Sequence, residues 1–150
     1  MKRSALWKTL PLILSLLLGG ALPALGEDPK PTAVVLHHAL GKKGEKESIP
    51  AKLKPYRKLL LKVGNQFEYG GGQTLQLTVG KSRSAKLPRG LGSASISIDR
   101  KGSVQVKLLD PKRKLLGSFR SGRFPLFIVN EKLKAGGAQY VLIIDKKRKR

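Results

Sequence analysis

The sequence contains no cysteine, and this absence excludes several kinds of site at once. No disulfide can stabilise the fold, so its stability has to come from the packed core. No thiolate exists to serve as a nucleophile or as a soft metal ligand. A lipid anchor attached through cysteine is excluded as well.

Acidic residues and histidines are also scarce, with 9 Asp and Glu and 2 His among 150 residues. His37 and His38 are adjacent in a segment expected to be a strand, where neighbouring side chains point to opposite faces. We expect one histidine to face the core and the other to be exposed, with no metal bound between them. The few carboxylates do not form the pair of a glycosidase. We therefore expect no enzyme activity, no catalytic residue and no cofactor.

Two glycine-containing stretches superficially suggest nucleotide binding. Gly80-Lys81-Ser82 would end a phosphate-binding loop only if a glycine stood five residues earlier, and that position is Leu75. The helix that should follow is opposed by Pro88. Gly70-Gly71-Gly72 lacks a strand–helix context, so we interpret it as a flexible hairpin connection or a β-bulge.

The first 26 residues have the composition of a secretory signal peptide. A basic start with Lys2 and Arg3 leads into an apolar run over 10–18, and small residues follow up to Gly26. The alternative is an uncleaved anchor, but the run is short for a span of ~20 residues. We expect cleavage and a soluble exported protein, periplasmic or secreted.

The charge of the remaining chain is strongly positive. Residues 27–150 hold 28 of the 31 basic residues and all 9 acidic ones, so their net charge is 28 − 9 = +19. Such a balance attracts polyanions, namely anionic lipid, acidic glycan or nucleic acid. The candidate polyanion-binding residues are Lys52, Lys54, Arg57, Lys58, Lys62, Lys146, Lys147, Arg148, Lys149 and Arg150. The alternative is a solvated surface, which the excess of lysine over arginine favours.

One amphipathic helix is predicted at about 51–63. Ser48 can cap it, and Leu53, Leu59 and Leu60 fall on one face while lysines take the other. Pro55 disfavours an early start of this helix. We expect its leucines to lie on a sheet and its lysines to face water, whereas the alternative is a helix lying on an anionic membrane.

The rest of the chain predicts short strands with turns every 8–12 residues. The clearest unit is the hairpin 93–109, in which apolar residues alternate with serines on both sides of a polar turn. The other expected strands are 32–40, 66–69, 73–79, 85–87, 114–121, 124–129 and 139–145, with 114–121 paired to 124–129 and with 41–48 and 131–138 as loops. Strand 139–145 is apolar on both faces, which suits a buried position.

These elements predict a mainly β fold: an antiparallel β-sandwich or partly open barrel of about seven strands, with the helix packed on it. The expected organisation is a signal peptide (1–26), a disordered leader (27–31), one β-rich domain (32–145) and a basic tail (146–150).

The segment Ile49-Pro50-Ala51-Lys52-Leu53, the connection Leu87-Pro88-Arg89-Gly90 and the alternating strands up to Ile144 carry a resemblance. Over about 49–145 the chain resembles small exported bacterial β-rich proteins of no assigned activity. The resemblance implies a periplasmic or secreted β-domain and carries over no functional residue.

Three functions follow as hypotheses. The first is an exported, non-enzymatic β-domain that acts as a binding or structural module at the cell envelope, with an unknown protein or envelope component as its partner. The second is a polyanion-binding protein that uses the basic helix face and the C-terminal tail. The third, a hydrolase with an unrecognised site, has no residue pattern in its favour.

Overall fold

The computed structural model describes residues 30–148, of which residues 31–148 belong to one compact unit. The expected signal peptide, most of the expected leader, and the candidate residues Lys149 and Arg150 lie outside the described residues.

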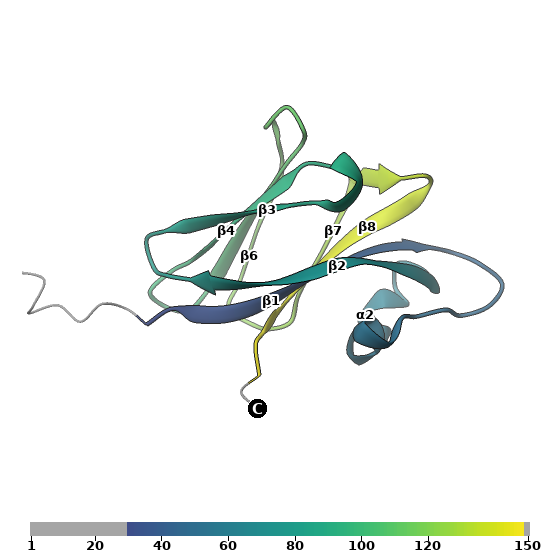
Figure 1. Ribbon diagram of the computed structural model, residues 1–150, viewed down its shortest axis with the longest axis horizontal. Helices are drawn as coiled ribbons and strands as arrows, with labels where there is room; N and C mark the ends of the chain where they lie inside the picture. The colour runs from purple at the N-terminus through teal and green to yellow at the C-terminus, as the bar shows by residue number, and fades with distance from the viewer. Residues whose placement is uncertain (1–29, 149–150) are drawn as a thin grey trace, which may run out of the picture. The chain divides into compact units, whose positions relative to one another are not determined.

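The domain consists of eight strands in two four-stranded antiparallel sheets (Figure 1). The strands are β1 (Thr32–Lys42), β2 (Gln66–Leu77), β3 (Ser82–Lys86), β4 (Ser93–Ile98), β5 (Val104–Leu109), β6 (Leu115–Ser121), β7 (Leu126–Ala135) and β8 (Ala138–Lys146). We call the sheet with the order β2-β1-β8-β7 sheet A, and the sheet with the order β3-β4-β5-β6 sheet B. The prediction of a mainly β, sandwich-like fold is confirmed.

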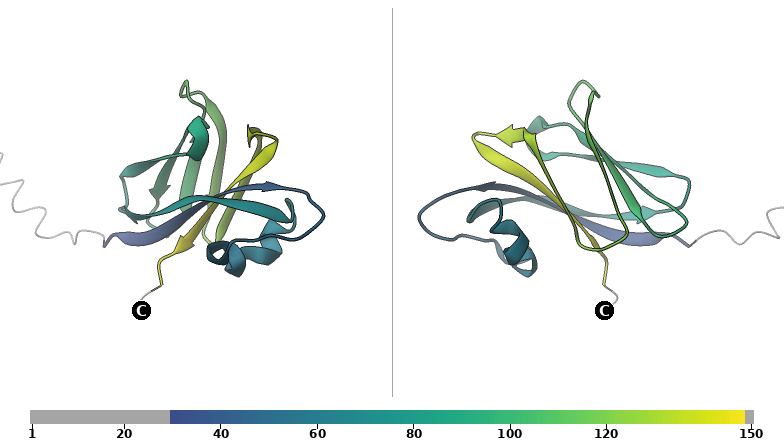
Figure 2. Two further views of the ribbon diagram at one scale, coloured as in Figure 1. Left: turned by 45° about the vertical axis from the view of Figure 1, so that its right-hand side comes forward. Right: turned by 180° about the vertical axis from the view of Figure 1, so that it is seen from behind.

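Strands that follow each other in sequence are neighbours nearly everywhere. The exceptions are the β2–β3 and β6–β7 connections, where the chain passes from one sheet to the other, and the pairing of β1 with β8 joins the two ends of the meander (Figure 2). This arrangement makes β1 and β8 the central strands of sheet A, and the apolar sequence of β8 predicted such a buried position.

The β4–β5 hairpin is confirmed in detail. Ile96 is paired with Val106, and both are fully buried. At the turn, the Asp99 carboxylate accepts hydrogen bonds from the backbone N–H groups of Lys101 and Ser103, each at 2.9 Å. Such local side-chain bonds fix a turn in the same way that Asx-turns do.

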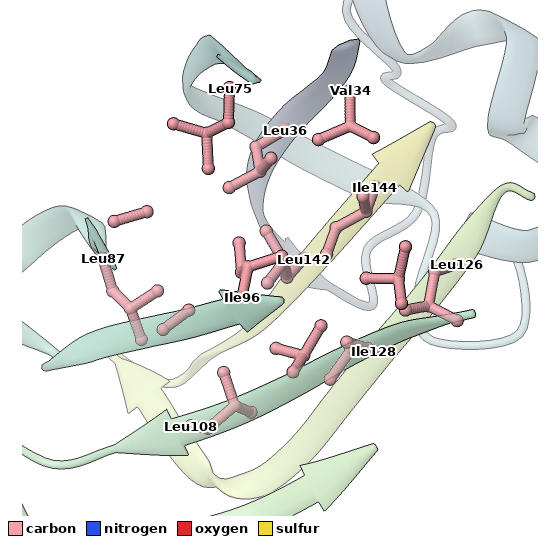
Figure 3. Packing of buried hydrophobic residues seen from close by; sticks show 14 of the residues in the cluster. Val34, Leu36, Leu75, Leu87, Ile96, Leu108, Leu126, Ile128, Leu142 and Ile144 are labelled. Carbon is pink, nitrogen blue, oxygen red and sulfur yellow. The ribbon is translucent and has the colours of Figure 1, made fainter. Parts of the chain in front are cut away.

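The main hydrophobic core lies between the two sheets (Figure 3). Leu36 and Leu142 from sheet A meet residues such as Ile96 from sheet B, and all three side chains are fully buried. Sealing one face of each sheet in this way follows from the alternating pattern of the strands.

A second, smaller core lies on the opposite face of sheet A, under residues 49–63, which we call the cover segment. Leu53 and Leu60 are fully buried in this core, against Ala39, Val141 and Ile143. The helix predicted at 51–63 is only partly correct. The cover segment forms a 3₁₀ helix, η1 (Ala51–Tyr56), and a single α-helical turn, α2 (Arg57–Leu60).

Pro55 explains why the α-helix is short. Its ring nitrogen has no hydrogen to donate to a backbone carbonyl, so the first turns of the segment adopt tighter 3₁₀ geometry instead. The expected orientation still holds, because Leu53 and Leu60 face the sheet, Leu59 is half-buried and Lys58 is exposed.

The glycine triplet is a bulge within one continuous strand, so the expectation of separate strands at 66–69 and 73–79 is wrong. The register between β1 and β2 shifts between His38 and Ala39, opposite the triplet. A Cβ on Gly72 would collide with the Tyr69 hydroxyl, so glycine leaves the space that this side chain occupies. The bulge thus lets the Tyr69 side chain lie back along its own strand.

The chain after residue 113 differs most from prediction. Segments 114–121 and 124–129 do not pair, because β6 pairs with β5 in sheet B and β7 pairs with β8 in sheet A. Residues 131–135, expected in a loop, continue β7 beyond a register irregularity between Val129 and Lys134. The irregularity interrupts the alternation from which strands are recognised in a sequence.

Candidate functional site

A cavity of about 460 Å³ opens beside the cover segment. We call it the basic groove, and its walls are Lys54, Pro55, Tyr56, Arg57, Lys58, Leu59 and Pro125. All but one of these residues come from the cover segment. Pro125 comes from the β6–β7 connection, so the groove forms only where the chain crosses from sheet B back to sheet A.

Aromatic and basic side chains continue the surface around Pro125. The Lys146 ammonium lies 5.4 Å from the ring centre of Phe124, the neighbour of Pro125. A cation at this distance from a ring face is attracted by its quadrupole. The end of β8 therefore contributes positive charge to the connection that walls the groove.

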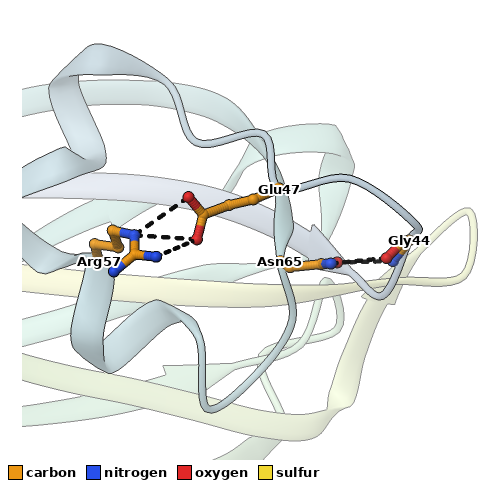
Figure 4. A network of polar contacts seen from close by, with 4 residues as sticks. All are labelled: Gly44, Glu47, Arg57 and Asn65. Atoms are coloured by element: carbon orange, nitrogen blue, oxygen red, sulfur yellow. Dashed lines mark hydrogen bonds and ion pairs between the residues drawn. The ribbon is translucent and has the colours of Figure 1, made fainter.

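Arg57 is the one groove cation whose charge is compensated. Its guanidinium group forms an ion pair with Glu47, with 2.8 Å between Nη2 and Oε1 (Figure 4). The loop that carries Glu47 is attached to the start of β2 by Asn65, the residue before that strand. The Asn65 side chain forms two hydrogen bonds of 2.7 Å with the backbone of Gly44. Arg57 thus connects the cover segment to the 41–48 loop.

The lysines of the groove have no such partner. Within residues 30–148, the three ion pairs all use arginine, namely Arg57–Glu47, Arg89–Glu68 and Arg120–Asp99, and no lysine takes part in one. Lys54 and Lys58 are exposed and line the same cavity. Their charges are therefore available to an anionic ligand.

Next to the groove lies a group of titratable side chains that we call the histidine–tyrosine cluster: His37, Tyr56, Tyr69 and Asp145. These residues come from β1, η1, β2 and β8 respectively. The Tyr56 hydroxyl donates to Asp145 Oδ2 at 2.7 Å, and His37 Nδ1 lies 3.0 Å from the Tyr69 hydroxyl. The His37 ring lies between the two tyrosine rings, at centroid distances of 5.6 and 5.9 Å.

The electrostatics of the cluster favour a neutral histidine and protonated tyrosines. Burial lowers the pKa of His37, although the Asp145 carboxylate acts in the opposite direction, and nearby Lys52 lowers it further. Burial also raises the pKa of Tyr56, and the hydrogen bond to Asp145 raises it again. Tyr56 therefore acts as a hydrogen-bond donor that holds the groove wall to β8.

The structure brings several of the predicted basic residues to this region. Lys54, Arg57 and Lys58 line the groove, and the Lys52 ammonium lies 5.2 Å from the centre of the Tyr69 ring. The charge of nearby Arg148 partly offsets the rise in the pKa of Tyr56 that burial and Asp145 cause. The helix face and the C-terminal residues, which are far apart in sequence, thus approach each other around Tyr56.

Other predicted residues contribute less directly. Lys62 and Lys147 are exposed, but neither lines the groove. Lys62 follows α2 in the sequence, and the backbone N–H of Lys147 is bound to the Ala33 carbonyl. Lys149 and Arg150 lie outside the described residues.

His38 faces the interior, as expected for one histidine of the pair. It is buried between the sheets, where its Nδ1 atom lies 2.6 Å from the Tyr140 hydroxyl. Burial lowers the pKa of His38, the amide of Gln73 opposes this shift, and His37 adds to it. The expectation that the other histidine is exposed is only partly correct, because His37 is half-buried beneath the tyrosines.

Residues 30–148 show neither a cluster of metal ligands nor a membrane-spanning helix. In this range no group of three or more His, Asp and Glu residues is placed to hold a metal ion. No helix in the same range is long and apolar enough to cross a membrane.

A second cavity, of about 480 Å³, lies where β1, β2 and the β7–β8 turn meet. Its arginine, Arg89, is bound to Glu68 at 2.7 Å, so the charges of the two side chains compensate each other. Lys42 is the other cation among the lining residues. This cavity is therefore less suited to an anionic ligand than the basic groove.

Sequence reasoning identified the basic residues of the site but not its aromatic and acidic parts. Neither Tyr56 nor Pro125 was among the predicted site residues. The wide separation of Tyr56 and Asp145 in the chain gave no signal of their contact. Comparisons with protein-family models, with curated proteins and with solved structures found no match for this chain.

Proposed function

We propose that this protein is an exported, non-enzymatic binding module of the cell envelope that holds a polyanion at the basic groove. The supporting observation is the cavity of about 460 Å³ that Lys54 and Lys58 line, where neither lysine forms an ion pair within residues 30–148. Phosphate, sulfate or carboxylate groups are the ligands that such lysines attract. The export half of the proposal rests on the composition of residues 1–26 alone.

The way the groove is built supports binding rather than catalysis. The carboxylates that contact the cover segment, Glu47 and Asp145, are already bound by Arg57 and Tyr56. Neither is a free general base, whereas the lysine charges remain uncompensated. The fold thus uses its few acids to fix the groove and leaves its cations for the ligand.

Heparin and duplex DNA are suitable probes, and binding is measured over a salt series. We expect affinity to be greatest at about 50 mM salt and to fall steeply as salt increases, because bound cations release counterions. The double variant Lys54→Glu/Lys58→Glu should lose at least about tenfold in affinity. The matched control Lys107→Glu/Lys112→Glu changes the net charge equally at exposed positions in and after β5.

Two results would contradict the proposal. One is undetectable binding of heparin, duplex DNA and anionic lipid vesicles alike at about 50 mM salt, where the attraction is strongest. The other is an equal loss of affinity in the two double variants, which would mean that binding follows the net charge rather than the groove.

A further inference from the structure

The basic groove is lined by apolar as well as cationic side chains. The apolar side chains favour a polyanion that also offers an apolar layer. Pro55, Leu59 and Pro125 line it together with the lysines. Leu61 directly follows α2 and does not line the groove, and its side chain is 39% exposed. In residues 30–148, only one other large hydrophobic side chain is exposed, Leu115 on β6.

Leu61 stands among cations. Lys58 and Lys62 are three residues before it and one residue after it, and helical spacing places Lys58, Leu61 and Lys62 on one face of the short turn. Lys54 shares the groove with Lys58. We call the surface formed by Lys54, Lys58, Leu61 and Lys62 the docking face.

An exposed leucine between lysines suits one kind of polyanion better than the others. Heparin and the DNA backbone offer charge but no apolar layer in which to bury a leucine. The boundary of an anionic bilayer offers both, because lipid phosphates lie directly above the acyl chains. Lysine stems can also lie along the apolar boundary while their ammonium groups remain at the phosphates.

The fold holds the docking face away from its own sheet. Leu53 and Leu60 anchor the cover segment on sheet A, so the opposite side of the segment faces outward. The hydrogen bond from Tyr56 to Asp145 and the ion pair from Arg57 to Glu47 hold the segment at two adjacent residues. The face is thus fixed before any ligand binds, which reduces the entropic cost of binding.

We propose that the docking face binds the surface of a bilayer rich in anionic phospholipid, with Leu61 entering the boundary below the headgroups. The proposal rests on the proposed function and names its ligand. Each lysine near an anionic surface strengthens partitioning by about fivefold. The leucine adds a contribution that does not depend on salt.

The test is sedimentation of the full chain with phosphatidylcholine vesicles that contain about a third phosphatidylglycerol, beside vesicles of phosphatidylcholine alone. We expect binding to the anionic vesicles that weakens with salt. Leu61→Ser should reduce the partition coefficient by about threefold to tenfold, since it removes most of one buried apolar side chain. Leu115→Ser is the matched control on β6 and should leave the coefficient within about twofold.

Variants of the docking face separate this proposal from the more general proposal of polyanion binding. All of them keep residues 1–30 unchanged, so any affinity of that segment for lipid cancels in the comparison. Leu61→Ser should not alter heparin affinity, whereas Lys58→Glu/Lys62→Glu should weaken binding to both heparin and anionic vesicles. Thermal unfolding curves establish that each variant is folded.

Three results would overturn the inference. Heparin binding without binding to anionic vesicles would refute it and leave the proposed function standing. Vesicle binding that Leu61→Ser and Leu115→Ser reduce equally would also refute it. Failure to bind heparin, DNA and anionic vesicles alike would refute both the inference and the proposed function.

Discussion

The two sheets face the same core but differ in regularity. In sheet B, burial alternates along β4 without exception, so that Ala94, Ile96 and Ile98 are buried between less buried serines. In sheet A, the alternation along β1 ends at His38, and every residue from there to Gly41 is buried. β8 is likewise buried continuously from Tyr140 to Ile144.

The difference arises from the outward faces. The outward face of sheet B carries short polar side chains such as Ser93, Ser95 and Ser97, which can remain in water. The outward face of sheet A carries Ala39, Val141 and Ile143, which need a cover. The cover segment supplies it and brings Tyr56 and the lysines with it, so the candidate site lies where the alternation fails.

The largest expected effect comes from placing a carboxylate under the cover segment of sheet A, compared with placing one on the outward face of sheet B. Leu60→Asp places a carboxylate in the second core, removes a fully buried side chain and should cost about 4 kcal/mol or more of unfolding free energy. Ser95→Asp on sheet B should change the unfolding free energy by less than about 0.5 kcal/mol. Urea unfolding measures both variants.

Lys58→Glu is a second control for the first prediction. The side chain is exposed on the cover segment, so we expect an almost unchanged unfolding free energy. A Lys58→Glu variant that is less stable than Leu60→Asp would mean that the cover segment is oriented the other way.

A smaller effect is expected from the polar contact that attaches the cover segment to β8. Tyr56→Phe removes the hydroxyl that donates to Asp145 while keeping the ring, and it should cost about 1–2 kcal/mol of unfolding free energy. Tyr69→Phe is the control, because its partner His37 is a neutral ring rather than a carboxylate. Equal losses in the two variants would argue against a special role for the Tyr56–Asp145 contact.

The smallest expected effect is a loss of unfolding free energy at acidic pH, caused by the two histidines and absent at neutral pH. Both histidines lie in sheet A, and burial is the main reason that the pKa of each is below the ordinary value of about 6.5. Below about pH 6.5 the unfolded chain therefore binds more protons than the folded one. We expect full stability above this pH and a progressive loss as the pH falls through it towards the folded pKa values.

The groups around the histidines define the controls for this measurement. His38 faces Tyr140 and Gln73, whereas His37 faces Tyr56, Tyr69, Asp145 and Lys52. Urea unfolding between about pH 7.5 and 5.5 should show a slope that His37→Gln and His38→Gln each reduce. A slope that is unchanged in both variants would show that other groups cause it.

The regular part of the molecule could be predicted from the sequence because its signals are local. Alternation of serine with Ala94, Ile96 and Ile98 defines the β4–β5 hairpin, since the side-chain period of a strand is two residues. The continuous apolar run of β8 likewise predicted its central position. The basic residues of the site were visible for the same reason, because charge is read directly from composition.

The tertiary structure alone decided which of these residues meet. Assignment of β6 and β7 to different sheets depends on pairing with β5 and β8, and this pairing brings Pro125 to the cover segment. The contact between Tyr56 and Asp145 joins residues separated by 89 positions. Non-local contacts of this kind depend on the packing of whole sheets, so local patterns in the sequence cannot define the groove, although they supply its lysines.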